Sequence, residues 1–251
     1  ARLGGETKDD KAVFLLNRPI EWGADGLTYE ADQRHVEIIT RDLGLGEGTK
    51  TTPMPYERPT LTDIENPKAD LEPRSATMYR AIVARANYLS QDRSDIRYAV
   101  KELSRNMSKP TESDMERLKR LGRYLKGHPR LVQHFKPQPY TQYLDVWVDT
   151  DWAGCLRTRK STNGGALMLG GHCIKSWSTT QAVIALSSGE AEFMAIATGL
   201  SESRYTQQLL HERAGLGVDD AGADALRCCH AHRGGRRPSW ASSASRRARR
   251  R

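Results

Sequence analysis

Apolar residues recur at helical spacing through the first half of the chain. Val36, Ile39 and Leu43 fall on one side of a predicted helix that has Asp32 as its N-cap and that stops at a run of glycines beginning with Gly44. Three further helices are predicted at residues 76–89, from Ser94 to Pro110 and from Thr111 to Gly127, with the inward residues Tyr79, Ile82, Val83 and Ala86; Ile96, Ala99, Val100, Leu103 and Met107; and Met115, Leu118 and Leu125. In the third, Thr111 and Asp114 resemble a capping box.

The segments before and between these helices lack a helical pattern. Residues 1–30 are expected to be irregular apart from a short strand at 12–16. Residues 49–75 hold five prolines and few large apolar residues, which predicts a linker or a long surface loop.

The apolar period changes from helical to alternating at Tyr143. Alternation over residues 143–148 predicts a strand, and residues 164–169 and 172–177 predict two more that are joined at Gly170-Gly171. A further short strand is expected at 182–186. Ser187 or Ser188 then caps a helix over 189–213, with Phe193, Ile196 and Leu200 facing inward. This order predicts an α/β unit that opens with an antiparallel meander.

Composition and charge change the picture mainly at the C-terminus. Hydrophobic residues make up 37% of the chain, below the usual ~45–50%. Nine arginines and no acidic residue lie at 227–251, which accounts for the net charge of +8, so the preceding residues are close to neutral. Residues 218–251 are therefore expected to form a disordered basic tail. No apolar run approaches the ~20 residues that span a bilayer, so a membrane protein is excluded.

A second basic excess lies on the predicted helix that begins after Thr111. Its cations allow two interpretations, a solvated helix face or a face that contacts the phosphates of a nucleic acid. These cations are Arg117, Lys119, Arg120, Arg123 and Lys126.

Four acidic residues mark the strongest candidate for chemistry. Asp149 and Asp151 follow the first predicted strand in VDTDWAG, and Glu190 and Glu192 lie in the first turn of the long helix in SSGEAEF. Clustered carboxylates favour a hard divalent cation such as Mg²⁺ or Mn²⁺, and two such ions could hydrolyse a phosphodiester. The alternative is structural, because aspartates are frequent in turns and acidic residues are favoured at helix N-termini.

Three motif blocks resemble the ribonuclease H domain of copia-type LTR-retrotransposon Pol polyproteins. These blocks are DTDWAG with the following RKST, the W-S-x-x-Q turn WSTTQ, and the helix start LSSGEAE. Upstream, ADGLTYEADQRHVEIITRDLGL, MYRAIVARANYLSQDRSDIRYAVKELSR and LKRLGRYLKG resemble the thumb and connection region behind the reverse transcriptase of the same family. The resemblance covers roughly residues 10–217.

The resemblance implies a ribonuclease H-like fold and a metal-dependent endonuclease. Asp149 would be a metal ligand, with Asp151 as the second member of its pair. Glu192 is favoured as the catalytic glutamate because EFMA matches the family's helix, and Glu190 is the alternative; the two lie about 200° apart on a helix, so both cannot serve one metal pair. The implied cofactor is a pair of Mg²⁺ (or Mn²⁺) ions, and the implied substrate is an RNA–DNA hybrid.

The same resemblance implies a wider context for the chain. It predicts a longer polyprotein with reverse transcriptase and integrase, located in cytoplasmic virus-like particles and in the nucleus, with no membrane partner. The expected division is a reverse-transcriptase remnant with a linker (1–75), a helical connection segment (76–139), a partial ribonuclease H-like domain (140–217) and the tail (218–251).

Two features depart from the family pattern. The Tyr-x-Asp-Asp element of the polymerase is absent, so DNA synthesis by this chain alone is not predicted. The family's third catalytic aspartate lacks a matching context, although Asp219, Asp220 and Asp224 are present as candidates. A rival hypothesis is therefore a catalytically decayed fragment that at most binds nucleic acid through its basic tail, and the arginine-rich tail itself suggests a shifted reading frame.

Overall fold

The chain folds into two compact units. A computed structural model describes residues 2–139, 141, 143–214 and 226–230 of the 251-residue chain. The N-terminal unit spans residues 1–137 and the C-terminal unit begins at Gln138. The first two predicted segments, 1–75 and 76–139, thus share one unit instead of forming a remnant and a separate connection segment.

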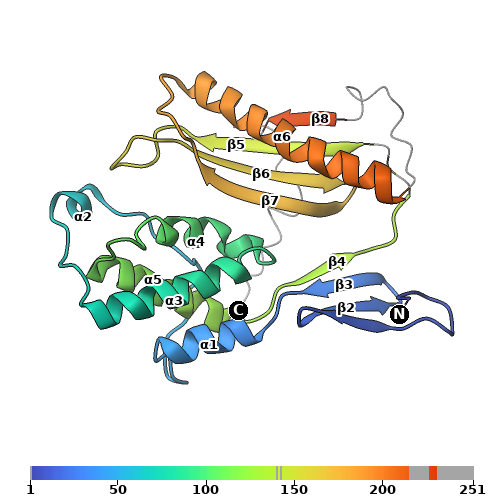
Figure 1. The fold of residues 1–251 in the computed structure, drawn as a ribbon, viewed down its shortest axis with the longest axis horizontal. Helices are drawn as coiled ribbons and strands as arrows, with labels where there is room; N and C mark the ends of the chain where they lie inside the picture. Colours follow the sequence, from blue (N-terminus) through green and yellow to red (C-terminus); the bar gives the residue numbers. More distant parts are fainter. Residues whose placement is uncertain (1, 140, 142, 215–225, 231–251) are drawn as a thin grey trace. The chain divides into compact units, whose positions relative to one another are not determined.

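An antiparallel sheet forms one part of the N-terminal unit. Its strands are β1 (Ala12–Leu15), β2 (Arg18–Gly23), β3 (Gly26–Glu30) and β4 (Val132–Phe135), in that order across the sheet (Figure 1). The prediction of β1 is confirmed, but the expectation that the rest of residues 1–30 is irregular is wrong. The β1–β2 turn is formed by Leu16 and Asn17, with φ values of 52° and 60°, so it lacks the glycine that normally signals a hairpin.

Helices supply the core of the N-terminal unit. They are α1 (Arg34–Asp42), α3 (Pro73–Leu89), the 3₁₀ helix η1 (Ser94–Ile96), α4 (Arg97–Ser104) and α5 (Glu112–Gly127). The inward residues predicted for these helices are confirmed as buried, except that Met107 is only partly buried against the same core. The Asp32 cap is confirmed, because Asp32 Oδ1 accepts from Arg34 N at 3.0 Å at the start of α1, although the helix itself is assigned from Arg34 onward.

The predicted linker contains a short helix of its own. This helix, α2 (Leu61–Glu65), begins with a capping box in which Thr60 Oγ1 accepts from Asp63 N at 3.2 Å and Asp63 Oδ2 accepts from Thr60 N at 2.8 Å. The capping box predicted for Thr111 and Asp114 at the start of α5 is confirmed.

Glu30 links the sheet to the segment that follows α5. Its buried carboxylate accepts from Arg130 Nε at 2.9 Å and from Arg130 Nη2 at 2.7 Å. These hydrogen bonds are the main reason why the pKa of Glu30 is lower than its usual value of 4.5. Because the carboxylate is favoured in the folded state, its contribution to stability is complete above the unfolded pKa and is lost as the pH falls through the folded pKa.

We therefore expect Glu30→Gln to flatten the loss of stability of the N-terminal unit below pH 4.5. Urea unfolding of the full chain at a series of pH values measures this slope. Glu65→Gln, at an exposed site in α2, is the matched control and should leave the slope as in the wild type. Equal slopes for wild type and Glu30→Gln would contradict the assignment.

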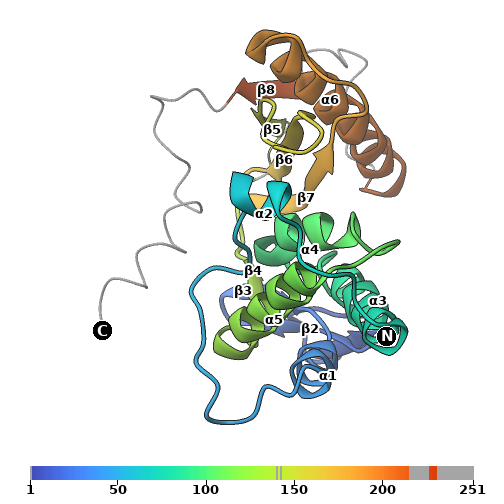
Figure 2. The same ribbon diagram turned by 90° about the vertical axis from the view of Figure 1, so that its left-hand side faces the viewer.

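The C-terminal unit is a second sheet with one long helix. Its elements are β5 (Leu144–Asp151), β6 (Thr162–Leu169), β7 (His172–Thr180), α6 (Ser188–Ala214) and β8 (Leu226–His230). The strand order is β7-β6-β5-β8, with β5, β6 and β7 antiparallel and β8 parallel to β5 (Figures 1 and 2). The predicted hairpin at Gly170-Gly171 is confirmed, and Gly170 has a φ of 60°.

Two predicted features of this unit are wrong. Residues 182–186 form no strand, and the side chains of Val183, Ile184 and Leu186 are exposed. Residues 226–230, within the segment predicted to be a disordered tail, form β8, which pairs in parallel with β5. Residues 231–251 lie outside the described part of the chain, and within the described part no helix is long and apolar enough to cross a membrane.

Helix α6 approaches the sheet through small residues. Phe193 and Leu200 were predicted to face inward, but they are 70% and 40% exposed. A Cβ atom at Gly199 would lie 2.7 Å from Val148 Cγ1 and 2.9 Å from Val146 Cγ1, so the helix backbone lies close to β5. Large side chains cannot occupy that narrow space. The buried face of α6 is instead formed by Ala191, Ala195, Gly199, Ser203 and Thr206.

Candidate active site at the end of strand β5

Asp149 lies near the C-terminal end of β5. The strand pairs with β6 without a break from Leu144, opposite Leu169, to Asp151, opposite Thr162. Side chains therefore alternate strictly, and Asp149 falls on the face opposite Val148. Asp149 is exposed, and its Oδ1 accepts from Thr150 N at 2.9 Å. The strand thus presents a solvent-accessible carboxylate.

Asp151 is turned toward the loop that follows the strand. A Cβ atom at Gly154 would lie 1.9 Å from Asp151 Oδ2, so the carboxylate occupies the space that glycine leaves open. Gly154 N also donates to Asp151 O at 3.3 Å. The two aspartates share a face of the strand, but the surroundings of Asp151 are those of a turn.

The start of α6 separates the roles of its two glutamates. Ser187 Oγ accepts from Glu190 N at 3.1 Å, which confirms Ser187 as one of the two predicted caps. The Glu190 carboxylate accepts from Leu186 N at 2.7 Å, closing a capping-box-like pair at this helix end. Glu190 therefore has a structural role in the cap. Glu192 lies one residue after the buried Ala191 and is half-buried.

Asp149 and helix α6 lie on opposite faces of β5. Helix α6 covers the face that carries Val146 and Val148, whereas Asp149 alternates to the other face. Within the described residues, no group of three or more His, Cys, Asp or Glu side chains is arranged to hold a metal ion. Asp224, like Asp219 and Asp220, lies outside the described residues.

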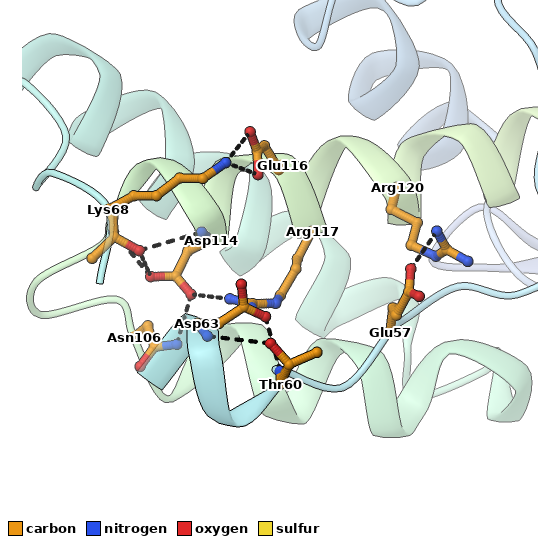
Figure 3. Close-up of polar contacts among 10 residues, drawn as sticks. Glu57, Thr60, Asp63, Lys68, Asn106, Asp114, Glu116, Arg117 and Arg120 are labelled. Carbon is orange, nitrogen blue, oxygen red and sulfur yellow. Dashed lines mark hydrogen bonds and ion pairs between the residues drawn. The ribbon is translucent and has the colours of Figure 1, made fainter. Parts of the chain in front are cut away.

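Most of the basic face of α5 is engaged by the chain itself. Figure 3 shows Arg117 and Arg120 turned toward acidic side chains of the segment between α1 and α3. Arg117 Nη2 lies 3.4 Å from Asp63 Oδ2, and Arg120 Nη1 lies 2.8 Å from Glu57 Oε2. Lys126 donates to backbone oxygens of residues 46 and 47. These three cations thus hold the segment between α1 and α3 against the helix.

The remaining two predicted phosphate-contacting cations differ in exposure. Lys119 is exposed and Arg123 is half-buried. A further ion pair has its charges exchanged between the two elements: Lys68, in the segment between α1 and α3, pairs with Glu116 of α5, with both Nζ–Oε distances at 2.7 Å (Figure 3). The α5 face is therefore a mixed, internally paired surface, which favours the structural interpretation over a continuous cationic track for Arg117, Arg120 and Lys126.

Sequence reasoning missed a set of buried polar residues beside the candidate site. Ser161, Asn163 and Gln181 are at most 4% exposed, although their residue types are usually found at the surface. Ser161 belongs to the RKST block and Gln181 closes the W-S-x-x-Q block, so the motif residues were visible in the sequence but their burial was not.

The C-terminal unit thus carries acidic residues at the end of a strand and in the first turn of the helix packed on it, in a mixed α/β fold. Comparisons with known proteins identify relatives that are similar to the chain in sequence. The retrovirus-related Pol polyproteins from transposons RE1 and RE2 of Arabidopsis thaliana are 41% and 38% identical over 54% and 61% of the chain. An uncharacterized mitochondrial protein of Arabidopsis thaliana is 39% identical over 77% of the chain and 78% of its own length.

The chain belongs to the family of retrovirus-related Pol polyproteins of copia-type retrotransposons. It spans about a tenth of the two transposon polyproteins, 9% of the first and 10% of the second. No protein-family model matches the chain. The resemblance stated from the motif blocks is therefore confirmed at the level of the family.

Proposed function

We infer that the chain is the ribonuclease H-like part of a retrotransposon Pol polyprotein and that it hydrolyses the RNA strand of RNA–DNA hybrids. The observation that carries this proposal is the direct packing of α6 on β5, the two elements that bear the SSGEAEF and VDTDWAG motifs. The strand order β7-β6-β5-β8 places β5, which carries the VDTDWAG motif, inside the sheet between β6 and the parallel strand β8. Membership of the Pol family supports the same proposal.

Asp149 and Glu192 are the proposed ligands of Mg²⁺ or Mn²⁺, and they would have to reach the ion past the end of β5, because Asp149 lies on the face of β5 that α6 does not cover. Their hard carboxylate oxygens suit these ions, and Mg²⁺ is commonly held by only one or two carboxylates together with water. A divalent ion bound there would supply activation of the attacking water and stabilisation of the leaving oxygen. The use of Glu190 in the helix cap favours Glu192 as the ligand. Asp151 and Asp224 remain the alternative candidates for catalytic residues.

The hybrid is the proposed substrate because recognition can rest on features that RNA–DNA duplexes share. These features are backbone phosphates, groove shape and the 2′-hydroxyl groups, and none requires a base sequence. The same family membership supports a setting within a longer polyprotein that also holds reverse transcriptase and integrase. Cytoplasmic particles and the nucleus are the proposed locations.

Cleavage of a labelled RNA–DNA hybrid in the presence of Mg²⁺ or Mn²⁺ tests the proposal. We expect Asp149→Asn and Glu192→Gln each to reduce the cleavage rate by about a hundredfold or more, equivalent to ~2.7 kcal/mol. Two matched variants serve as controls. Asp145→Asn makes the same change on the same face of β5, and Glu190→Gln keeps an oxygen that can accept from Leu186 N. Both should stay within about threefold of the wild type.

Each other outcome has a defined meaning. Cleavage that survives Asp149→Asn would remove Asp149 from the site, and loss of cleavage in Glu190→Gln but not in Glu192→Gln would exchange the two glutamates. A wild-type chain that cleaves no hybrid with either ion would overturn the proposal in favour of a catalytically decayed fragment.

A further inference from the structure

Three buried polar side chains lie between the elements that carry the candidate carboxylates. Ser161 is 0% exposed, and Asn163 and Gln181 are each 4% exposed. Ser161 precedes β6, Asn163 lies in β6, and Gln181 follows β7. None of these residues has a place in the proposed chemistry. Their hydrogen bonds, however, join the three motif blocks of the sequence.

Gln181 connects β6 to the first turn of α6. Its Nε2 donates to Asn163 Oδ1 at 2.7 Å and to Ala191 O at 2.8 Å. Ala191 directly precedes Glu192, so this hydrogen bond holds the helix backbone at the candidate glutamate. Both partners are acceptors, which fixes the orientation of the Gln181 amide.

The orientation of Asn163 is fixed from the opposite direction. Thr198 Oγ1 donates to Met194 O at 2.9 Å, so it accepts from Asn163 Nδ2 at 3.2 Å. Asn163 Oδ1 is therefore left to accept from Gln181. Hydrogen bonds thus run in one direction from Gln181 through Asn163 to Thr198, and they contact α6 on both sides of Glu192.

Ser161 continues the connection to the turn after β5. Gln181 N donates to Ser161 O at 2.9 Å, and Ser161 Oγ accepts from Ala153 N at 3.0 Å. Ala153 lies two residues after Asp151 and has a φ of 53°, a left-handed conformation that is unfavourable for alanine. The Ser161 hydroxyl therefore helps to hold a strained turn that directly follows the aspartate pair.

We propose that Ser161, Asn163 and Gln181 are positioning residues that fix Glu192 relative to the end of β5. This inference rests on the proposed function, because the network is proposed to set the distance between the two metal ligands, Asp149 and Glu192. Apolar packing alone is non-directional, whereas buried hydrogen bonds define both distance and angle. The helix start and the strand end are thereby held by the same buried chain of polar groups.

Gln181→Met in the full chain tests the proposal by amide hydrogen exchange without any metal ion. Methionine keeps the length of the side chain, and Gln181 Oε1 has no partner among the described residues, so the variant is expected to fold. We expect exchange in residues 191–195 to become at least about tenfold faster while the remainder of the unit changes less. Thr198→Val, an isosteric change at the far end of the network, should produce the same local effect even if Gln181→Met unfolds.

Ser203→Ala is the matched control. Ser203 is 0% exposed on the same helix, but its hydroxyl donates to Leu200 O within α6. Its removal should leave exchange in residues 191–195 unchanged. Unchanged exchange in both network variants, or an acceleration of equal size across the whole unit, would overturn the proposal.

Binding of Mn²⁺ alone, followed by electron paramagnetic resonance, separates this inference from the proposed function. We expect Gln181→Met to weaken Mn²⁺ binding by about tenfold or more and Ser203→Ala to leave it unchanged. Wild-type binding that Gln181→Met preserves would overturn the positioning role and leave the proposed function standing. A wild type that binds no Mn²⁺ would overturn the proposed function and the assigned purpose of the network, and exchange would still decide whether these residues fix the start of α6.

Discussion

Replacing Arg93 with methionine is expected to lower the free energy of unfolding of the N-terminal unit by about 3–5 kcal/mol. The Arg93 side chain is 1% exposed, and its guanidinium donates to both carboxylate oxygens of Asp95, at 2.9 and 2.7 Å. It also donates to the carbonyl oxygens of His128 at 2.9 Å and Pro129 at 3.2 Å. Methionine supplies similar apolar volume but leaves these partly buried acceptors without their donors.

The position of Arg93 explains why the effect should be large. Arg93 precedes η1, and the two carbonyl groups lie just beyond Gly127, where the last carbonyls of α5 lack partners within the helix. Asp95 also accepts from Tyr124 OH of α5 at 2.9 Å. The substitution would therefore loosen the contact between the η1 turn and the end of α5. Domains of this size are stable by only about 5–15 kcal/mol, so the loss is a large fraction of the total.

Urea unfolding followed by circular dichroism measures the change. Arg41→Met is the matched control, because Arg41 also pairs with an aspartate, Asp42, at 3.0 Å, but both side chains are exposed, by 73% and 37%. Exposed pairs contribute little to stability, so the control should resemble the wild type. Equal losses in the two variants would show that burial is not the source of the effect.

The sequence predicted the parts of the fold in which spacing and burial agree. The helical stripe through Ile82, Val83 and Ala86 is buried as expected, because a helix of this length can hide only one face. The alternating residues of β5 and the Ser187 cap of α6 were equally predictable. Each of these features depends on neighbours within a few positions along the chain.

The structure differs where distant residues decide the outcome. Strand β4 pairs with β3 from about a hundred residues away, so no local pattern indicates the first sheet. On α6, hydrophobicity favoured Phe193 and Leu200, but the close approach to β5 admits only small residues such as Gly199. Such a choice depends on the distance between helix and sheet, which local spacing does not encode.

The candidate site was predictable only where it depends on local sequence. Strand and helix boundaries placed Asp149 and the two glutamates at the ends of β5 and α6, and the resemblance distinguished among them. The cap role of Glu190 and the buried network through Gln181 depend on contacts between separate elements. The motif blocks contained these residues, but only the fold shows which of them face one another.

Gly165→Ala is expected to destabilise the C-terminal unit by about 3 kcal/mol, at the upper end of the cost of overpacking. Gly165 lies opposite Trp177 of β7, and a Cβ atom at Gly165 would lie only 2.0 Å from Trp177 Cζ2 and 2.3 Å from Cε2. The ring has little room to move, because it is 7% exposed and lies 3.7 Å from the position of a Cβ at Gly199 of α6. A single methyl group would therefore have to displace either the ring or the helix.

Gly164→Ala provides a matched control for this prediction. It makes the same change one residue earlier in β6, on the other face of the sheet, where the nearest atom to an added Cβ is Asp149 O at 3.9 Å. Its stability should stay within about 0.5 kcal/mol of the wild type, as is usual for changes that meet no close neighbour. Thermal unfolding of both variants, followed by tryptophan fluorescence, compares the two faces directly. A Gly165→Ala chain as stable as Gly164→Ala would show that Trp177 can leave its place over β6, and that α6 does not hold it there.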